Sequence, residues 1–241
     1  MALRDYVAEF MDTPSEGIGV FMVHLRRAEE RIPIILALEA AIQTPLEIVD
    51  AVEGKDIIAA GHPTICGIDE GVIRSAGEVG CMASHIAIMV EALKRGLTHA
   101  IIFEDDCSPC HLNPLPAIQE YLRDAKRFVQ QFQMEGVKEL LLLGTCGCYS
   151  WRHLTTGVKS TQHFNGSHAY IISAKFMRAT IAFYIGVLRE GKTAPIDGVL
   201  PILLKREGLW SICPENDTAF FRQNREIASY TASDGTERRQ G

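Results

Sequence analysis

Three consecutive carboxylates, Glu104, Asp105 and Asp106, follow the apolar segment Ala100–Phe103. Adjacent carboxylates repel one another unless a cation lies among them. A hard divalent cation takes oxygen ligands, and it typically reaches a protein through one or two carboxylates together with substrate phosphates. In an extended segment Glu104 and Asp106 point one way and Asp105 the other. The spacing therefore favours a metal site at Glu104 and Asp106, with a solvated acidic turn as the alternative.

The elements that must position these carboxylates alternate along the chain. Short apolar runs predict buried strands at Ile18–Leu25, Leu46–Val52, Thr98–Phe103, Glu139–Leu143, Ser167–Ser173 and Leu209–Cys213. Helical patterns cover Ala28–Gln43 (regular from about Ile32), Glu78–Arg95, Ala117–Met134, Ala174–Arg189 and Ile196–Arg206. This alternation predicts an α/β fold with a mostly parallel central sheet flanked by helices. Ligands of such sheets bind beyond the carboxyl ends of the strands, where the acidic triplet stands.

Two long segments lack such patterns and are expected to be loops that carry specificity: the glycine-rich residues 60–77 and the segment Gly144–His163. A turn is expected at Glu53-Gly54-Lys55, after the second strand. We predict an N-terminal extension at residues 1–17, a single domain at residues 18–228, and a polar, flexible tail at residues 229–241.

Composition describes an ordinary soluble globular chain of 241 residues, of which 47% are hydrophobic. Lys and Arg number 24 and Asp and Glu 30, so the net charge is −6, which argues against a nucleic-acid partner. Seven cysteines, an odd set, and a charged rather than apolar N-terminus predict a cytoplasmic location. No uninterrupted apolar window of about 18 residues is present, so we expect no membrane span and leave peripheral contact open.

Two neighbouring segments, GEVGCMASHIAIMVEAL (Gly77–Leu93) and LTHAIIFEDD (Leu97–Asp106), resemble the central block of glycosyltransferase family 25. These are the lipopolysaccharide and procollagen-type β-galactosyltransferases. Weaker matches keep the family's order at Val20–Arg31, Asp50–Lys55, Asn165–Ser173 and Pro195–Asp197, so the likeness covers about residues 18–215. The chain departs from the family pattern at two positions, with His24 in place of Asn and Glu53 in place of Asp.

The resemblance implies a GT-A-like, Rossmann-type sandwich and an inverting transfer of a hexose, galactose or glucose, from a UDP-sugar donor. It also implies Mn2+ or Mg2+ at Glu104 and Asp106, and a glycan or lipid-linked glycan acceptor in lipopolysaccharide or other surface glycan synthesis. Such an enzyme would work in the cytoplasm, where contact with the inner membrane surface would be peripheral.

Site roles follow from the same resemblance. Asp197, in the family's Pro-x-Asp, is the expected catalytic base; it could instead be only a helix N-cap, and Glu215 is a rival base. For His85 the alternative to a donor contact is a half-buried core histidine. The residues expected to bind the donor are Arg26, Glu53, Lys55, Arg74, Gly77, Ser84, His85 and Asp105.

Three other interpretations stay open. Cys107-x-x-Cys110-His111 and Cys146-x-Cys148 could assemble a zinc site, although their spacing fits no common zinc module. A metal-dependent phosphohydrolase could use the same carboxylates, although the aspartate-nucleophile phosphatase pattern is not met. A non-catalytic nucleotide-sugar or glycan-binding homologue is kept open by His24 and Glu53, since both stand at expected donor contacts.

Overall fold

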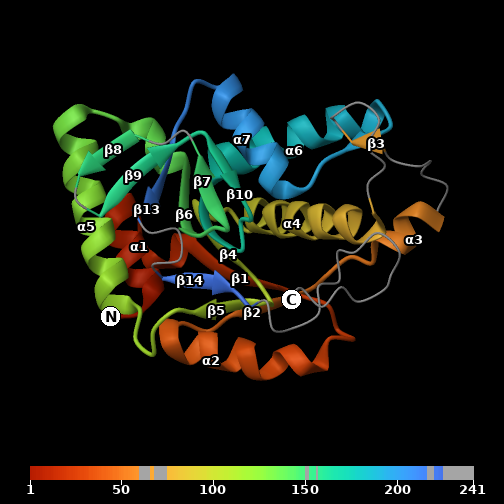
Figure 1. Cartoon of the computed structure of the whole chain (residues 1–241), viewed down its shortest axis with the longest axis horizontal. Coiled ribbons are helices and arrows are strands. Elements are labelled where there is room, and N and C mark those ends of the chain that lie inside the picture. The colour runs from red at the N-terminus through yellow and green to blue at the C-terminus, as the bar shows by residue number, and fades with distance from the viewer. Residues whose placement is uncertain (60–65, 68–74, 150–151, 156, 216–219, 225–241) are drawn as a thin grey trace.

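The computed structural model in Figure 1 describes residues 1–59, 66–67, 75–149, 152–155, 157–215 and 220–224. Its centre is an eight-stranded sheet in the order β2-β1-β4-β11-β6-β13-β9-β8. These strands are β1 (Ile18–His24), β2 (Glu47–Asp50), β4 (His99–Glu104), β6 (Leu140–Gly144), β8 (Arg152–Thr155), β9 (Val158–Thr161), β11 (Ala169–Ser173) and β13 (Ser211–Pro214). Two-stranded sheets pair β10 (His163–Asn165) with β7 (Gly147–Tyr149), β12 (Lys192–Thr193) with β3 (Cys66–Gly67), and β14 (Phe221–Gln223) with β5 (Cys107–Pro109).

Strand direction makes the central sheet mixed but largely parallel. β1 pairs parallel with β2 and β4, and β13 pairs parallel with β6. β11 runs antiparallel to both β4 and β6, and β9 runs antiparallel to β13 and β8. Only β11 and β9 therefore oppose the other strands of this sheet, which confirms the predicted α/β class.

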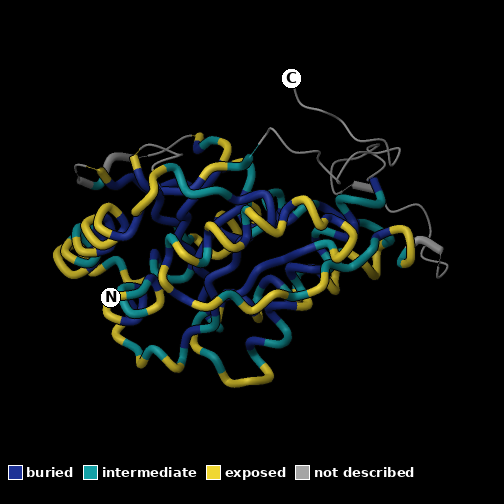
Figure 2. The backbone as a smooth tube through the Cα atoms, turned by 90° about the horizontal axis from the view of Figure 1, so that it is seen from below, coloured by how far each residue is buried: buried dark blue, intermediate teal, exposed yellow. Residues whose placement is uncertain are grey.

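Helices cover both faces of the sheet. One face packs on α1 (Leu3–Met11), α2 (Ile32–Ile42) and α5 (Leu115–Phe132), and the other on α4 (Ala76–Lys94), α6 (Ala174–Arg189) and α7 (Ile196–Arg206). Alternation along β4 supplies both cores: Ile101 and Phe103 join the first, and Ala100 and Ile102 join the second. Figure 2 shows the buried strands in the interior, with exposed residues on the outer helices and turns.

Residues 1–17, expected as an extension, are integrated into the first core. Leu3 and Val7 of α1 are fully buried, and Phe10 is 2% exposed. The short 3-10 helix η1 (Ser15–Gly17) then leads into β1. Removing this segment would therefore expose apolar surface of the same domain that holds the acidic triplet.

Helix α4 carries the family-like block and has clear end signals. Ser75 caps it in a reciprocal capping box with Glu78, and Gly96, with φ 73°, follows its last turn. Helix α4 is long and apolar enough, by length and composition alone, to cross a membrane, whereas no membrane span was predicted from the sequence. In this structure it is a core helix, because its buried residues, Met82 and His85 among them, pack against the sheet and α6.

Close backbone packing explains two glycines beside α4. A Cβ on Gly54 would lie 1.7 Å from the Ala76 carbonyl oxygen, and one on Gly80 would lie 2.4 Å from the Val52 carbonyl oxygen. The expected turn at residues 53–55 is instead the start of a helix, α3 (Gly54–Ala59), which packs directly on α4. Lack of a Cβ is what allows this contact, since any side chain would displace one helix.

The other predicted elements are confirmed by the structure. They are strands β1, β2, β4, β6, β11 and β13 and helices α2, α4, α5, α6 and α7. The loop predicted at Gly144–His163 is wrong, because this segment contains β7, β8 and β9 and the start of β10. These strands are three or four residues long and polar, so they carry little apolar alternation; β9 is fixed by pairing with β13, far away in sequence. Most of the other predicted loop, residues 60–77, lies outside the described residues, as does the tail from residue 225.

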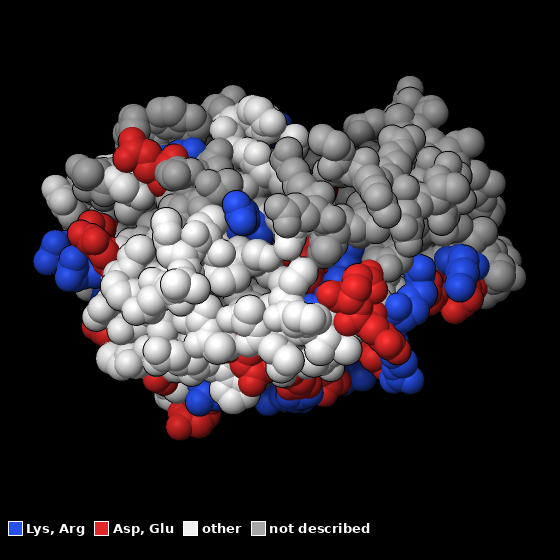
Figure 3. Space-filling model, turned by 60° about the horizontal axis from the view of Figure 1, so that its bottom comes forward, with Lys and Arg blue, Asp and Glu red and all other residues white. Residues whose placement is uncertain are grey.

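One face of the molecule carries charges of both signs. Figure 3 shows one face of the molecule, with Lys and Arg side chains lying among Asp and Glu side chains around its margin. On the described part of that face neither sign forms an extended stripe. This distribution gives no support to a nucleic-acid-binding surface there.

Candidate active site

The acidic triplet lies where several strands end together. β1 and β4 run parallel, so His24 and Glu104 come to the same edge of the sheet. β11 runs the opposite way, so its first residues reach that edge as well, and the Glu104 amide donates to the His168 carbonyl oxygen at 3.0 Å. The fold thus brings side chains from several distant segments, including the start of α7, around the end of β4.

Asp105 faces the β1 and α2 side, as the alternation predicted, and its carboxylate is used inside the fold. Oδ2 lies 2.9 Å from His24 Nδ1 and accepts the Leu25 amide at 3.2 Å, while Oδ1 accepts from Arg31. His24, Arg31 and Asp105 are all less than 9% exposed. Asp105 was expected to contact the donor, but these partners make it a buried anchor between strand and helix.

Asp106 and Glu104 lie on the other side and are less completely paired. Asp106 Oδ2 accepts from Gln223 Nε2 at 3.1 Å, whereas the buried Oδ1 has no hydrogen-bond partner among the described residues. Burial and the neighbouring Glu104 carboxylate raise the pKa of Asp106 to about 7. Burial acts to raise the pKa of Glu104, but His85, together with His168 and Arg31, outweighs burial and holds that pKa below the ordinary value. Two carboxylates in this state fit a divalent cation, which would give Asp106 Oδ1 its missing partner.

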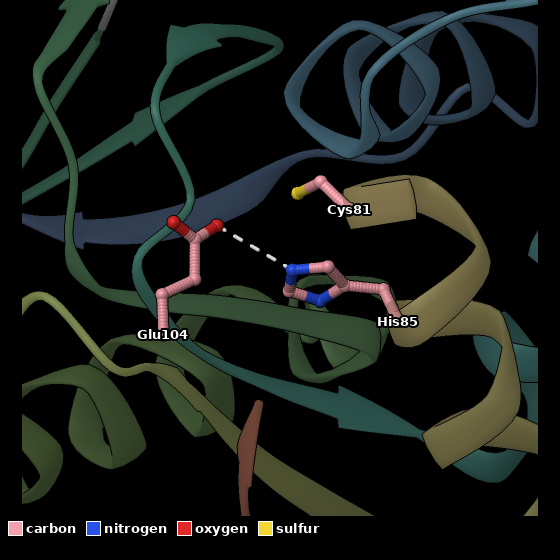
Figure 4. Close-up of side chains that lie close together, drawn as sticks. All are labelled: Cys81, His85 and Glu104. Atoms are coloured by element: carbon pink, nitrogen blue, oxygen red, sulfur yellow. Dashed lines mark ion pairs between the residues drawn. The ribbon is translucent and has the colours of Figure 1, made fainter. Parts of the chain in front are cut away.

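His85 extends the site onto α4. Its Nδ1 lies 2.8 Å from the Tyr170 hydroxyl, and its Nε2 lies 3.4 Å from Glu104 Oε1. Figure 4 shows Cys81, one turn earlier on α4, pointing toward the same carboxylate. Burial and Glu104 raise the pKa of the Cys81 thiol well above its ordinary range. The expected half-buried histidine is in fact completely buried, because Tyr170 on β11 covers it.

Asp197 reaches the same region from the start of α7. The N-cap of α7 is Pro195, so the capping alternative is wrong, and Asp197 lies in the first turn with Oδ2 accepting the Gly166 amide at 2.8 Å. Burial raises the pKa of Asp197, and the Glu104 carboxylate raises it further. Asp197 is therefore within electrostatic reach of the triplet, as a base acting there would have to be.

Glycosyltransferase family 25 (LPS biosynthesis protein) matches residues 18–185 of the sequence. The chain belongs to glycosyltransferase family 25. The two segments that resemble the family's central block, Gly77–Leu93 and Leu97–Asp106, form most of α4 and all of β4. These elements bring Cys81, His85 and Glu104 together, with potential ligand atoms within 4.8 Å of one another.

Curated relatives from the same family are similar to parts of the chain. It is 32% identical over 95 residues to "Inactive glycosyltransferase 25 family member 3" of Mus musculus, covering 36% of this chain and 16% of that protein. It is 21% identical over 230 residues to "Procollagen galactosyltransferase 2" of Homo sapiens, covering 88% of this chain and 33% of that protein. The chain thus spans about a sixth to a third of the length of these relatives.

Solved structures of low identity also resemble the chain. A mannose-1-phosphate geranyltransferase from Thermus thermophilus is similar over 84% of this chain and 76% of that one, with a TM-score of 0.38 and 10% identity. A UDP-glucose pyrophosphorylase complexed with UDP-glucose is similar over 90% and 80%, with a TM-score of 0.36 and 10% identity.

The remaining donor candidates of this family 25 domain lie in different surroundings. Arg26 is exposed and pairs with Asp50, and Glu53 accepts from Arg27 at 2.8 Å and lies 4.0 Å from Lys55 Nζ. These residues follow the ends of β1 and β2, at the edge of the sheet where the triplet ends β4. They form the exposed rim of that edge.

Two further candidates lie on α4, and one of them is structural. Ser84 donates to the Gly80 carbonyl oxygen at 2.7 Å and accepts the Val52 amide at 2.8 Å, so it ties the end of β2 to α4. Gly77 occupies the first turn of α4. Arg74 lies outside the described residues.

The rival base Glu215 accepts the Gly157 amide at 3.2 Å, beside the β8–β9 turn.

The cysteine-rich zinc alternative is not supported. Cys148 Sγ lies 3.4 Å from Cys213 Sγ, in the core, rather than beside Cys107 and Cys110. In the part of the chain that the structure describes, the cluster of potential metal ligands is Cys81, His85 and Glu104. Cys81 was not among the predicted site residues, although it lies in the family-like block Gly77–Leu93.

Two residues near the triplet were missed altogether. His168 is buried, its Nε2 lies 3.2 Å from the Phe221 carbonyl oxygen, and its Nδ1 has no hydrogen-bond partner among the described residues. Gln223 bridges Asp106 and Cys146. The family-like segment that contains His168 was a usable signal, whereas nothing local marks Gln223, which lies 117 residues from Asp106.

Proposed function

We propose that this family 25 domain transfers a hexose, galactose or glucose, from a UDP-sugar to a glycan hydroxyl, with Mn2+ or Mg2+ held by Glu104 and Asp106. The observation that carries the proposal is the buried Oδ1 of Asp106, which has no hydrogen-bond partner among the described residues and lies close to the Glu104 carboxylate. Buried polar atoms are nearly always paired, so this oxygen supports binding of a partner that the described residues do not supply, and the proposed cation would be that partner. Contact with the membrane surface, where lipid-linked acceptors lie, remains part of the proposal.

The transfer requires a donor held by its diphosphate and a base for the acceptor. The acceptor oxygen forms a bond to the anomeric carbon as the bond from that carbon to the phosphate oxygen breaks, so UDP leaves with the bonding electrons and the configuration inverts. A bound divalent cation supplies Lewis-acid stabilisation of the diphosphate charge. Glu104 and Asp106, at the end of β4, are the residues that would hold this cation.

Asp197 is the group that we assign to the acceptor proton. Its carboxylate takes the proton of the attacking hydroxyl, and the raised pKa brings its basicity closer to neutral pH than that of an exposed aspartate. The Gly166 amide, donating to Oδ2, fixes the carboxylate on the rigid start of α7. Positioning of this kind is what makes a side chain an effective general base.

Loss of activity within the family is the competing proposal. Relatives with "inactive" in their names match 36% of this chain, which keeps a non-catalytic nucleotide-sugar-binding role in view. The chain has the two carboxylates proposed to bind the metal, Glu104 and Asp106, and the proposed base Asp197. Family membership gives no support to a phosphohydrolase.

The test combines donor binding with turnover. Thermal unfolding is measured with UDP-glucose, UDP-galactose and GDP-mannose, each with and without Mn2+, because a ligand that binds only the native state raises the unfolding temperature. Release of UDP is then measured with a panel of glycan acceptors. We expect a UDP-sugar to stabilise the chain only with Mn2+, and Asp106→Asn to remove this effect, while the control Asp124→Asn, at a partly exposed position of α5, keeps it.

The outcomes separate the proposals. Mn2+-dependent binding together with UDP release supports a transferase, and loss of release in Asp197→Asn with retained binding supports the base. Binding without release for any acceptor supports the non-catalytic role. Absence of binding by every nucleotide sugar, with and without Mn2+, would overturn both.

A further inference from the structure

Cys81, His85 and Glu104 form a cluster that the proposed transfer does not use as a whole. One potential ligand atom from each residue lies within 4.8 Å of the other two. Figure 4 shows the thiol and the imidazole approaching the same carboxylate from successive turns of α4. A thiol, an imidazole and a carboxylate are the three side-chain ligand types of protein zinc sites.

His85 is the observation that points to a ligand. The residue is completely buried, yet Nε2 makes no hydrogen bond within the described part of the chain. It lies 3.4 Å from Glu104 Oε1, which is longer than an ordinary hydrogen bond. With Zn–N and Zn–O bonds of about 2.1 Å, a tetrahedral zinc ion separates two such ligand atoms by about 3.4 Å.

The surroundings of His85 prepare it for such a bond. Nδ1 lies 2.8 Å from the Tyr170 hydroxyl, and the two rings stack at 23°. A zinc-binding histidine usually hydrogen-bonds through its other ring nitrogen, which fixes the ring and selects the nitrogen that faces the metal. Cys81 and His85 are four residues apart on one helix, a spacing that puts both side chains on the same face.

We propose that Cys81 Sγ, His85 Nε2 and Glu104 Oε1 form a three-ligand Zn2+ site with one open coordination position. Thiolate and imidazole favour Zn2+ or Co2+, whereas Mn2+ and Mg2+ prefer oxygen. The site therefore differs in metal preference from the carboxylate pair Glu104 and Asp106, although both use Glu104.

Sharing Glu104 has a consequence that rests on the proposed function. Zn2+ held by Cys81 and His85 withdraws Glu104 from the Mn2+ position, so Zn2+ inhibits Mn2+-dependent transfer. The fourth position of the zinc ion stays open to water or to another oxygen ligand.

Metal binding tests the site directly, without donor or acceptor. The whole chain is freed of metal, and then Zn2+ is titrated by calorimetry and Co2+ by absorption. We expect one Zn2+ per chain and a thiolate-to-cobalt charge-transfer band. Cys81→Ser should remove the band and weaken Zn2+ binding by about 10-fold or more. Cys146→Ser, which removes an exposed thiol outside the cluster, should keep both.

Two more variants distinguish this site from the proposed Mn2+ site. Asp106→Asn should abolish stabilisation by Mn2+ and keep Zn2+ binding, whereas Glu104→Gln should weaken both. If every transferase assay fails, the proposed zinc site can therefore still be supported by Zn2+ binding. If only Zn2+ binding is absent, the proposed transferase activity is not affected. Zn2+ binding by Cys81→Ser with the affinity of the natural chain, or a wild-type chain without the cobalt band, would overturn the zinc site.

A measurement on the natural chain covers the case in which Cys81→Ser does not fold. Alkylation of Cys81 by iodoacetamide is followed by mass spectrometry of the peptide that contains it, with Cys146 as the internal reference. Zn2+ should slow alkylation of Cys81 more than that of Cys146. Equal rates for Cys81 with and without Zn2+ would contradict the proposal.

Discussion

The two sides of the segment that ends β4 treat their carboxylates in opposite ways. On the β1 and α2 side, Asp105 is surrounded by His24, Arg31 and the Leu25 amide. Asp106, which accepts from Gln223 of β14 and lies close to Glu104, keeps one buried oxygen without a hydrogen-bond partner among the described residues. The two aspartates are neighbours in sequence and are buried to a similar extent, but they differ in their partners. Residues of the chain bind both carboxylate oxygens of Asp105, whereas we propose that a metal ion binds the remaining oxygen of Asp106.

The first prediction concerns the stability supplied by the Asp105 side. Asp105→Asn leaves the buried Arg31 guanidinium facing a neutral amide, and breaking a buried ion pair typically costs about 3–5 kcal/mol of unfolding free energy. Domains of this kind have roughly 5–15 kcal/mol in total, so the loss is severe. Urea unfolding measures it, and the control Asp124→Asn, at a partly exposed position of α5, should change the midpoint little. A midpoint like that of the control would refute the anchoring role.

The second prediction is the opposite response at Asp106. Asp106→Asn removes a buried charge but keeps an oxygen that can accept from Gln223, so the metal-free chain should become more stable. Metal-dependent turnover should fall about 10²- to 10³-fold, because the metal's transition-state stabilisation is worth several kcal/mol. Paired measurements of unfolding temperature without metal and UDP release with Mn2+ check both signs. A destabilised variant with normal turnover would show that Asp106, like Asp105, is structural.

The third prediction is the pH dependence of that stability difference. The folded chain holds the proton of Asp106 up to about pH 7, whereas the unfolded chain releases it near the ordinary value of 3.8. Between these values the unfolded state binds fewer protons, so ionisation of Asp106 makes the natural chain less stable as pH rises. The stability advantage of Asp106→Asn should widen from about pH 4 to about pH 7 and stay constant above. Urea unfolding without metal across this range measures the advantage, and one that is independent of pH would contradict this origin.

Predictions from sequence succeeded where the pattern is local. The apolar strand Ala100–Phe103 and the carboxylates after it mark the end of β4 by their spacing alone, and helix α4 has periodic apolar residues with a capping box. Asp105 and Asp106 have different partners, as the alternation of an extended chain predicts, although the two residues lie in the turn between β4 and β5. What depends on neighbours in sequence was therefore predictable.

Pairing across the fold was not predictable from the same patterns. Arg26 and Arg31 both follow β1, and Arg26 was expected to bind the donor, yet it is Arg31 that turns inward to Asp105. Which arginine is buried depends on the turn η2 (Glu29–Arg31), whose path no periodicity reveals. The contact of Gln223 with Asp106 likewise follows from the antiparallel pairing of β14 with β5, not from any motif.

The smallest expected effect separates a surface arginine from a buried one. The Arg26 side chain is 85% exposed and its partner Asp50 is 58% exposed, and such pairs contribute little to stability because water and salt screen them. Arg26→Ala should therefore leave the urea midpoint unchanged, while Arg31→Ala should lower it strongly through the loss of the Asp105 partner. Because Arg26→Ala leaves the fold intact, any weaker Mn2+-dependent stabilisation by a UDP-sugar reports a direct donor contact. Unchanged stabilisation would show that the site ends inside the rim formed by Arg26 and Asp50.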